Sequence, residues 1–264
     1  MGSDILTEII SVRKRRVLEA QRTLPLEKLK AQVEQGTADR QVHRLATALS
    51  NDLRPNIIAE FKRRSPSKGV IRSDADPHAL SSAYERGGAA AISVLTEEDF
   101  FAGSLDDLRS VREAVRLPIL RKDFVFDEYQ VWESGAAGAA AILLIVSVLT
   151  DEELRSLRRL AEDGLGIDAL VEVHSATELQ RALTAGAKII GVNNRNLRSF
   201  EVSLDVSVDL AREAPAETIL VSESGIATRD DLTRLRELGY RGFLIGESLM
   251  RAADPEQTLR SLLG

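Results

Sequence analysis

A (β/α)8 barrel with an N-terminal helical extension is the fold that the sequence predicts. Three observations support it: eight short apolar runs rich in Val, Ile and Leu, amphipathic helix-length segments between them, and glycines where those segments end. Strands buried on both faces have this composition, and eight such units with right-handed crossovers close into a barrel. An open doubly wound sheet is the competing fold. The regularity of the units and the lack of an early GxGxxG motif favour the barrel.

The first 52 residues do not fit the repeat, so residues 1–52 are assigned to the extension and residues 53–264 to the barrel, within one domain overall. The extension is expected to hold two helices, at Asp4–Arg22 and Leu26–Val33, and then a loop at Ser50–Pro55. The basic run from Arg13 to Arg16 suggests either a nucleic-acid patch or a solvated helix face. The second interpretation is favoured because the chain is acidic overall.

The barrel elements follow in order. The expected strands are Ile57–Phe61, Ala89–Leu95, Pro118–Leu120, Ala139–Val146, Ala169–Val173, Lys188–Val192, Thr218–Val221 and Gly242–Ile245. The clearest helices between them are Pro77–Arg86, Asp106–Val115, Asp151–Glu162, Ala176–Thr184 and Arg229–Leu238. Thr150 and Thr228 are predicted N-caps, because each precedes an acidic first turn.

Composition excludes several classes of function. The chain has no cysteine, which excludes disulfides, thiolate catalysis and cysteine-bound metals, and its three histidines are too scattered to suggest a zinc site. A net charge of −6 provides no general basic field for nucleic acid. The longest apolar run, Gly135–Val148, is too short to span a membrane. We therefore expect a cytoplasmic protein that binds neither nucleic acid nor membranes. The sequence leaves its oligomeric state open, and a monomer is expected.

Polar residues gather at the carboxyl ends of the predicted strands, where barrel enzymes hold their active sites. They are Glu60, Lys62, Lys122, Phe124, Glu172, His174, Asn193, Arg195, Glu223, Ser224, Gly225, Gly246 and Glu247, with the aromatic Phe124 among them because it shares a face with Lys122. A buried charge is usually a structural ion pair, and His174 taken alone is interpreted in that way. Agreement of six strands on one rim instead favours a shared pocket.

Part of the ligand is indicated by glycines near the end of the chain. Ser224-Gly225 and Gly246-Glu247 follow the last two strands, and they offer backbone N–H groups where barrels commonly hold phosphate. Ser65, in the loop "RRSPSKG", is placed to close on the ligand from the opposite side. The pocket is therefore predicted to take a small, doubly anionic, phosphorylated substrate.

Six long stretches occur in order along nearly the whole chain: "IIAEFKRRSPSKG", "PILRKDFVFDEYQ", "ALVEVHSATEL", "IIGVNNRNL", "VSESGI" and "FLIGESLM". In these stretches the sequence resembles the indole-3-glycerol phosphate synthase family of tryptophan biosynthesis. One mild departure is Phe61, where an aliphatic residue often lies between the glutamate and the lysine. The resemblance implies closure of the pyrrole ring of 1-(2-carboxyphenylamino)-1-deoxyribulose 5-phosphate with release of carbon dioxide and water. It implies no cofactor and no metal.

The resemblance also implies roles for individual residues. Lys122 would be the general acid and Glu172 the general base, while Lys62 would pair with the substrate carboxylate and serve as an acid in dehydration. Glu60 would orient the lysine, and Asn193 would hold reacting hydroxyls. Substrate contacts would come from Phe124, Arg195 and Glu223, and phosphate contacts from Ser65, Ser224, Gly225, Gly246 and Glu247. A lysine acid working near neutral pH is expected to have a pKa below its reference of about 10.4.

Three other functions stay open. A Schiff-base aldolase also uses a lysine at a barrel rim as its nucleophile. The phosphoribosylanthranilate isomerase family shares the phosphate-binding barrel, although the missing cysteine argues against it because that family usually employs a cysteine base. A phosphate-binding barrel without activity is the third, and the presence of Glu60, Lys62, Lys122 and Glu172 together argues against it.

Overall fold

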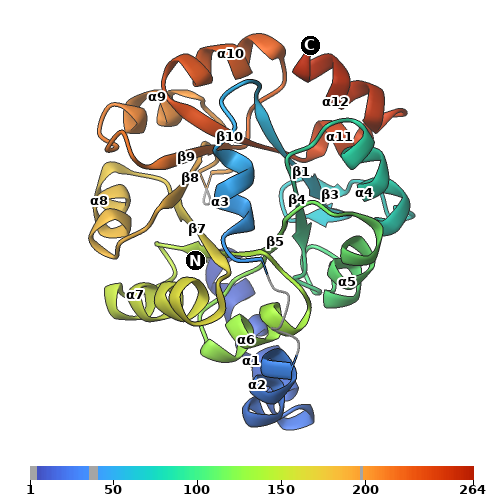
Figure 1. The fold of residues 1–264 in the computed structure, drawn as a ribbon, viewed down its shortest axis with the longest axis vertical. Coiled ribbons are helices and arrows are strands. Elements are labelled where there is room, and N and C mark those ends of the chain that lie inside the picture. Colours follow the sequence, from blue (N-terminus) through green and yellow to red (C-terminus); the bar gives the residue numbers. More distant parts are fainter. Residues whose placement is uncertain (1–4, 36–40, 197–198) are drawn as a thin grey trace.

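A closed ring of eight parallel strands forms the centre of the molecule, with helices around it (Figure 1). The computed structural model describes residues 5–35, 41–196 and 199–264. Around the ring the strand order is β1-β10-β9-β8-β7-β6-β5-β4, so each strand pairs with its neighbours along the chain and the last pairs with the first. The predicted (β/α)8 barrel is confirmed, and the open sheet is excluded because β1 and β10 are hydrogen-bonded.

The barrel strands are β1 (Asn56–Phe61), β4 (Ala91–Leu95), β5 (Ile119–Lys122), β6 (Ala141–Ile145), β7 (Asp168–Val173), β8 (Ile189–Asn193), β9 (Ile219–Glu223) and β10 (Tyr240–Ile245). The helices are α1 (Ile5–Thr23), α2 (Leu26–Gln35), α3 (Arg44–Leu49), α4 (Pro77–Arg86), α5 (Leu105–Ala114), α6 (Glu128–Ala136), α7 (Asp151–Arg159), α8 (Ala176–Thr184), α9 (Asp205–Ala211), α10 (Arg229–Glu237), α11 (Glu247–Arg251) and α12 (Pro255–Leu263). Each predicted strand overlaps one barrel strand. Thr150 and Thr228 cap α7 and α10 through capping boxes, as predicted.

Alternation along each strand decides which residues face the barrel interior. On β5, Leu120 packs in the inner apolar cluster with residues of β6, β7 and β10, while Ile119 packs in the larger cluster between strands and helices. On β7, Leu170 is inside and Val171 outside. The same alternation directs Lys122 and Glu172, near the carboxyl ends of these strands, into the barrel mouth.

The extension lies against the barrel beside α6, below the ring in Figure 1. Helices α1 and α2 correspond to the two predicted helices, although Asp4, the expected first residue, lies outside the described residues. The expectation of a solvated basic face is wrong for Arg13, which is only 4% exposed, whereas Lys14, Arg15 and Arg16 are exposed as expected. Arg13 is buried because it pairs with the carboxylate of Asp123.

Helix α3 covers the amino-terminal end of the barrel, in front of the strands in Figure 1. Its Leu45 and Leu49 are fully buried in the inner apolar cluster. Asp168 of β7 accepts hydrogen bonds from the backbone N–H groups of Leu45 and Ala46, at 2.8 and 3.0 Å. This helix was not predicted from the sequence, because a six-residue segment is too short to show a helical period.

Between β1 and α4 lies a short hairpin, β2 (Arg64–Ser65) and β3 (Gly69–Val70), in the loop where only a turn was predicted. A π-helical turn, η1 (Leu160–Gly164), ends the α7 segment. No helix in the described part of the chain combines the length and the apolarity that crossing a membrane requires.

Candidate active site

A cavity of about 700 Å³ opens at the carboxyl ends of the strands. All the residues predicted for the site line it: Glu60, Lys62, Ser65, Lys122, Phe124, Glu172, Asn193, Arg195, Glu223, Ser224, Gly225, Gly246 and Glu247. They come from loops and strand ends all around the ring, and the barrel brings them together because its parallel strands all end on one rim.

Lys122 lies at the centre of the charged residues. Its Nζ is 3.4 Å from Glu172 Oε2 and 3.3 Å from Glu223 Oε2. Both carboxylates are almost wholly buried, at 2% and 1% exposure. An ammonium group flanked by buried carboxylates stays charged, and a charged amine is not nucleophilic. This arrangement argues against Lys122 as a Schiff-base nucleophile.

The pKa values of these three groups depend on one another. Burial lowers the pKa of Lys122, but the attraction of Glu223, Glu172 and Glu60 outweighs burial and raises it above its ordinary value. The expectation of a lowered lysine pKa is therefore wrong, because three carboxylates act on the ammonium. Burial raises the pKa of Glu172, yet the charges of Lys122 and His174 lower it overall.

Glu223 differs from Glu172 although both contact the same lysine. Burial, together with the negative charge of Glu172, raises the pKa of Glu223 to about 7 despite the attraction of Lys122. Its Oε1 is buried without a hydrogen-bond partner. Gly191 of β8 leaves room for this carboxylate, since a Cβ there would lie 2.2 Å from Oε1. A side chain at position 191 would displace Glu223.

Glu60 and Lys62 form a second ion pair on the inner face of β1. Glu60 is 3% exposed and its partner is partly exposed to the cavity. Gly246 permits this placement, because a Cβ on Gly246 would lie 2.5 Å from Glu60 Oε1. Gly246, which was predicted to bind phosphate, is therefore also needed to leave room for the Glu60 carboxylate.

Asn193 and Ser224 join the ends of β8 and β9. Ser224 Oγ donates to Asn193 Oδ1 at 3.0 Å, and the backbone N–H of Arg195 donates to the same oxygen at 3.1 Å. Ser224 and Gly225 both have positive φ, 66° and 84°, so the chain turns sharply at the pocket wall. Gly225 cannot be replaced freely, since a Cβ would lie 2.8 Å from Val202 Cγ1.

The hairpin β2–β3 approaches the loop after β10 at the rim of the cavity. Ser65 is 7% exposed and accepts a hydrogen bond from the backbone N–H of Lys68 at 3.2 Å. Lys68 Nζ is 4.0 Å from Glu247 Oε1. The hairpin therefore lies beside the loop that carries Gly246 and Glu247, because β1 and β10 are neighbouring strands. That Ser65 closes on the ligand from the opposite side stays a prediction.

An apolar wall of the cavity was missed by the sequence reading. Phe101, in the loop after β4, lies 6.1 Å from Phe124 between ring centroids, at an interplanar angle of 44°. Ile5, Leu6 and Ile9 of α1 line the same cavity. The apolar residues of the first helix were visible in the sequence, but their spacing does not show which surface they meet. The resemblance to the family alone implied that this segment lies near the active-site mouth.

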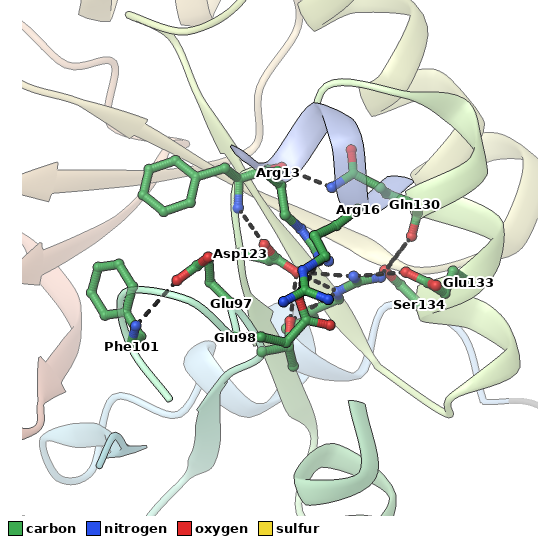
Figure 2. Close-up of polar contacts among 12 residues, drawn as sticks. Arg13, Arg16, Glu97, Glu98, Phe101, Asp123, Gln130, Glu133 and Ser134 are labelled. Carbon is green, nitrogen blue, oxygen red and sulfur yellow. Dashed lines mark hydrogen bonds and ion pairs between the residues drawn. The ribbon is translucent and has the colours of Figure 1, made fainter. Parts of the chain in front are cut away.

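A second charged cluster lies on the outer side of β5, between the barrel and α1 (Figure 2). Asp123 Oδ2 accepts from Arg13 Nη2 at 2.6 Å, from Arg121 Nη2 at 2.9 Å and from Thr96 Oγ1 at 2.7 Å. Arg13 also reaches Glu98 in the loop after β4 at 3.0 Å. The extension is thus tied by charge to the two loops that carry Phe101 and Phe124.

The polar groups of the pocket are lysines, carboxylates, amides and backbone groups. Within the ranges that the structure describes, no three or more His, Asp or Glu side chains converge as a metal site would require. Cationic and backbone donors in a cavity suit an anionic organic ligand.

Comparison with known proteins relates the whole chain to one family. The family model described as "Indole-3-glycerol phosphate synthase" matches residues 6–262. The proteins of that name from Carboxydothermus hydrogenoformans and Albidiferax ferrireducens are 47% and 44% identical. These alignments cover 98% of this chain, with 99% and 98% of the respective relatives.

Solved structures with little sequence similarity share the fold. 3-Hexulose-6-phosphate synthase from Salmonella typhimurium superposes with a TM-score of 0.63 at 12% identity, covering 78% of this chain and 96% of that one. Thiamine phosphate pyrophosphorylase from Pyrococcus furiosus gives a TM-score of 0.59 at 16% identity, covering 79% and 93%. At such identities the likeness concerns the barrel alone.

Proposed function

The chain belongs to the indole-3-glycerol phosphate synthase family, and from that premise we propose how its pocket residues carry out the family's reaction. The enzyme is a carboxy-lyase of tryptophan biosynthesis. It closes the pyrrole ring of 1-(2-carboxyphenylamino)-1-deoxyribulose 5-phosphate and releases carbon dioxide and water, giving indole-3-glycerol phosphate. The observation that carries the assignment of roles is the position of Lys122 between Glu172 and Glu223 in the barrel mouth.

Lys122 is the general acid of ring closure. The aryl carbon that bears the carboxylate attacks the ketone, and negative charge develops on the carbonyl oxygen, so a positioned acid must deliver a proton there. Lys122 enters the reaction protonated because three carboxylates raise its pKa. Its proton becomes transferable when the developing alkoxide is a stronger base than the Lys122 amine. Glu223, whose pKa lies at about 7, is suited to return a proton to the lysine.

Glu172 is the general base, since it is held ionised by neighbouring cations. After decarboxylation, dehydration removes a proton from the ring and a hydroxyl from the neighbouring carbon. Glu172 takes the proton, and Lys62 protonates the leaving hydroxyl after pairing with the substrate carboxylate. Glu60 orients Lys62 through their ion pair. Asn193, fixed by Ser224, holds the reacting hydroxyls.

Binding is divided between two ends of the cavity. The phosphate is held by Ser65, Ser224, Gly225, Gly246 and Glu247, the last two through their backbone N–H groups. At the other end the aryl ring lies against Phe124 and Phe101, where an aromatic pair already forms an apolar wall. Arg195 and Glu223 contact the ribulose portion.

We propose that residues 1–52 act as an extension that completes the apolar wall through α1. We also propose that the enzyme works as a cytoplasmic monomer without nucleic acid or membranes.

The function is tested by mixing the protein with the carboxyphenylamino substrate and following indole fluorescence. The dephosphorylated substrate is the matched control. It should lose most of its binding, because each hydrogen bond to a charged group contributes about 1.5–3 kcal/mol. Absence of indole fluorescence with the full substrate would overturn the function. Equal kcat/KM for the two substrates would remove the phosphate site from the proposal.

A further inference from the structure

His174 lies directly behind the proposed base, and the roles above give it no part. It follows β7, two residues after Glu172 on the same face, and its side chain is 17% exposed. Its Nε2 is buried without a hydrogen-bond partner and lies 3.5 Å from Glu172 Oε1. Its Nδ1 lies 3.3 Å from Glu178 Oε2 on α8, the carboxylate oxygen that also accepts from the backbone N–H of His174 at 2.8 Å. The imidazole thus joins two carboxylates.

The charged groups that face this imidazole come from three elements. Glu172 lies on β7, Glu178 on α8 and Glu223 on β9, and all of them favour the imidazolium form. Burial lowers the pKa of His174, but these three carboxylates together raise it above its ordinary value. Lys122 approaches the same Glu172 carboxylate through its other oxygen, Oε2. Glu172 therefore has a cation on each side.

We propose that His174 is a positioning residue for Glu172, with Glu178 holding its imidazolium so that it remains the cation beside Glu172 when Lys122 gives up its proton. The inference rests on the proposed function, in which Lys122 is the acid and Glu172 the base. No covalent step is added. The proton leaves Lys122 Nζ for the ketone oxygen of the substrate, and His174 keeps its own proton throughout.

The need for such a residue follows from the charges in the pocket. While Lys122 is protonated, it offsets the buried charge of Glu172. Once Lys122 is neutral, Glu172 loses this opposite charge and would tend to take up a proton before the dehydration step needs it as a base. A second cation 3.5 Å from Glu172 keeps that carboxylate ionised. Its anchor on α8 lies outside the substrate cavity, so substrate binding leaves it in place.

The first test is the pH dependence of kcat/KM for wild type and His174→Asn. Removal of the imidazolium should raise the pKa of Glu172, so the acid limb of the profile should move to higher pH by about one unit, as expected for loss of an opposite charge within 4–6 Å. The rate at the optimum should fall about tenfold, less than the roughly 10²–10⁴-fold that a general acid or base itself contributes, because His174 only positions the base. His78→Asn, at an exposed position on α4, is the control and should leave the profile unchanged.

The second test does not depend on turnover. The chain has three histidines, so the imidazole signals in a proton NMR titration can be assigned by the one that His174→Asn removes. His174 should titrate above about 6.5, the ordinary pKa of histidine. Both Glu178→Gln and Glu172→Gln should lower that value. Glu178→Gln should also move the alkaline loss of activity to lower pH, because His174 then loses its charge earlier.

The outcomes separate this inference from the proposed function. No turnover of the substrate by wild type overturns the proposed function. Normal turnover with an unmoved acid limb in His174→Asn overturns the role of His174 alone, because a purely structural histidine would lower the rate equally at every pH. A His174 pKa that does not respond to Glu172→Gln also overturns it, even if the asparagine variant folds poorly.

Discussion

Strand β5 carries two charged clusters on opposite faces, and they differ in how completely their polar atoms are paired. On the outer face, Arg121 is fully buried and donates to Thr96, Asp123, Gln130, Glu133 and Ser134. On the inner face, Lys122 meets two carboxylates at 3.3–3.4 Å. Beside it, Glu223 Oε1 and His174 Nε2 are buried without partners. The outer cluster has an unpaired atom of its own, Nε of Arg13, on the extension.

This difference shows how buried charges that stabilise the fold differ from buried charges that serve the active site, on one and the same strand. A buried ion pair costs desolvation, and it is tolerated where hydrogen bonds satisfy each group. Around Arg121 and Asp123 that condition is met, and the pKa of Asp123 is held below its ordinary value by Arg13 and Arg121 even though burial raises it. Around Lys122 the pairing is incomplete, and the pKa of Glu223 is raised to about 7. Buried donors and acceptors that lack partners are available to a substrate.

The largest effect should follow from Lys122→Met. A general acid acts in the transition state, so its loss should lower kcat by about two to four orders of magnitude while substrate still binds. Lys62→Met should weaken substrate binding more than Lys122→Met does, because its main partner is the substrate carboxylate. Single-turnover rates and binding titrations on both variants provide the measurement. A near-wild-type single-turnover rate in Lys122→Met would show that another residue is the proton donor.

The next effect concerns Glu172→Gln, which should keep the fold and lower kcat about a hundredfold. The matched control is Glu162→Gln in η1. Glu162 is also buried, at 4% exposure, but its partners are Arg158 and Lys188, outside the cavity. The control should lose stability and keep its kcat per folded molecule. If Glu172→Gln instead lost stability while its activity per folded molecule stayed unchanged, the role of Glu172 would be structural.

A smaller change in rate, with a clear loss of stability, is expected when the outer cluster is broken. Arg13→Met leaves Asp123 with Arg121 as its remaining cation, so the free energy of unfolding should fall by about 3 kcal/mol, at the low end for loss of one member of a buried pair. Activity should fall less than about tenfold, because no group that touches the substrate is removed. The control is Arg16→Met one turn away, whose pair with Asp99 is exposed and worth about 1 kcal/mol or less. Denaturant unfolding and kcat are measured on the same samples. A loss of kcat with unchanged stability in Arg13→Met would contradict the structural role of the outer cluster.

The barrel and the inner residues of its rim could be predicted from the sequence because both depend on local patterns. Apolar runs mark the strands, and alternation past Leu120 or Leu170 directs Lys122 and Glu172 inward. The same alternation places Arg121 and Asp123 outside, but the sequence does not state which helix covers them. Burial of Arg13 depends on a contact with Asp123, 110 positions away along the chain. No local pattern specifies such a pair.

Other parts of the site depend on contacts that strand alternation does not describe. Phe101 is held at the cavity by Glu97, whose carboxylate accepts from the backbone N–H groups of Asp99, Phe100 and Phe101. Helix α1 is held there by Arg13, which pairs with Asp123 and Glu98. The raised pKa of Lys122 depends on how many carboxylates lie close to its ammonium group. Strand alternation predicts that these side chains face the same cavity, but it does not predict the distances between them. The glycines at 191 and 246 have a steric reason, room for Glu223 and Glu60, that a sequence pattern cannot reveal.

The smallest predicted effect distinguishes the two clusters by the pH range in which each one changes stability. Asp123 has a lowered pKa in the folded state, so its contribution is present above its ordinary pKa of 3.8 and is lost as pH falls below it. Glu223 has a raised pKa, so the folded state holds its proton more tightly than the unfolded chain does. Stability should therefore decline as pH rises from about 4.5 to about 7. Burial also raises the pKa values of Glu97 and Glu98, so the part of the slope that comes from the inner cluster is the part that Glu223→Gln removes. Glu223→Gln should remove roughly 1–3 kcal/mol of that decline, since one pKa unit corresponds to about 1.4 kcal/mol. Denaturant unfolding at pH 5 and pH 8 measures it, and an equal decline in wild type and Glu223→Gln would mean that Glu223 is already ionised in the folded pocket at pH 5.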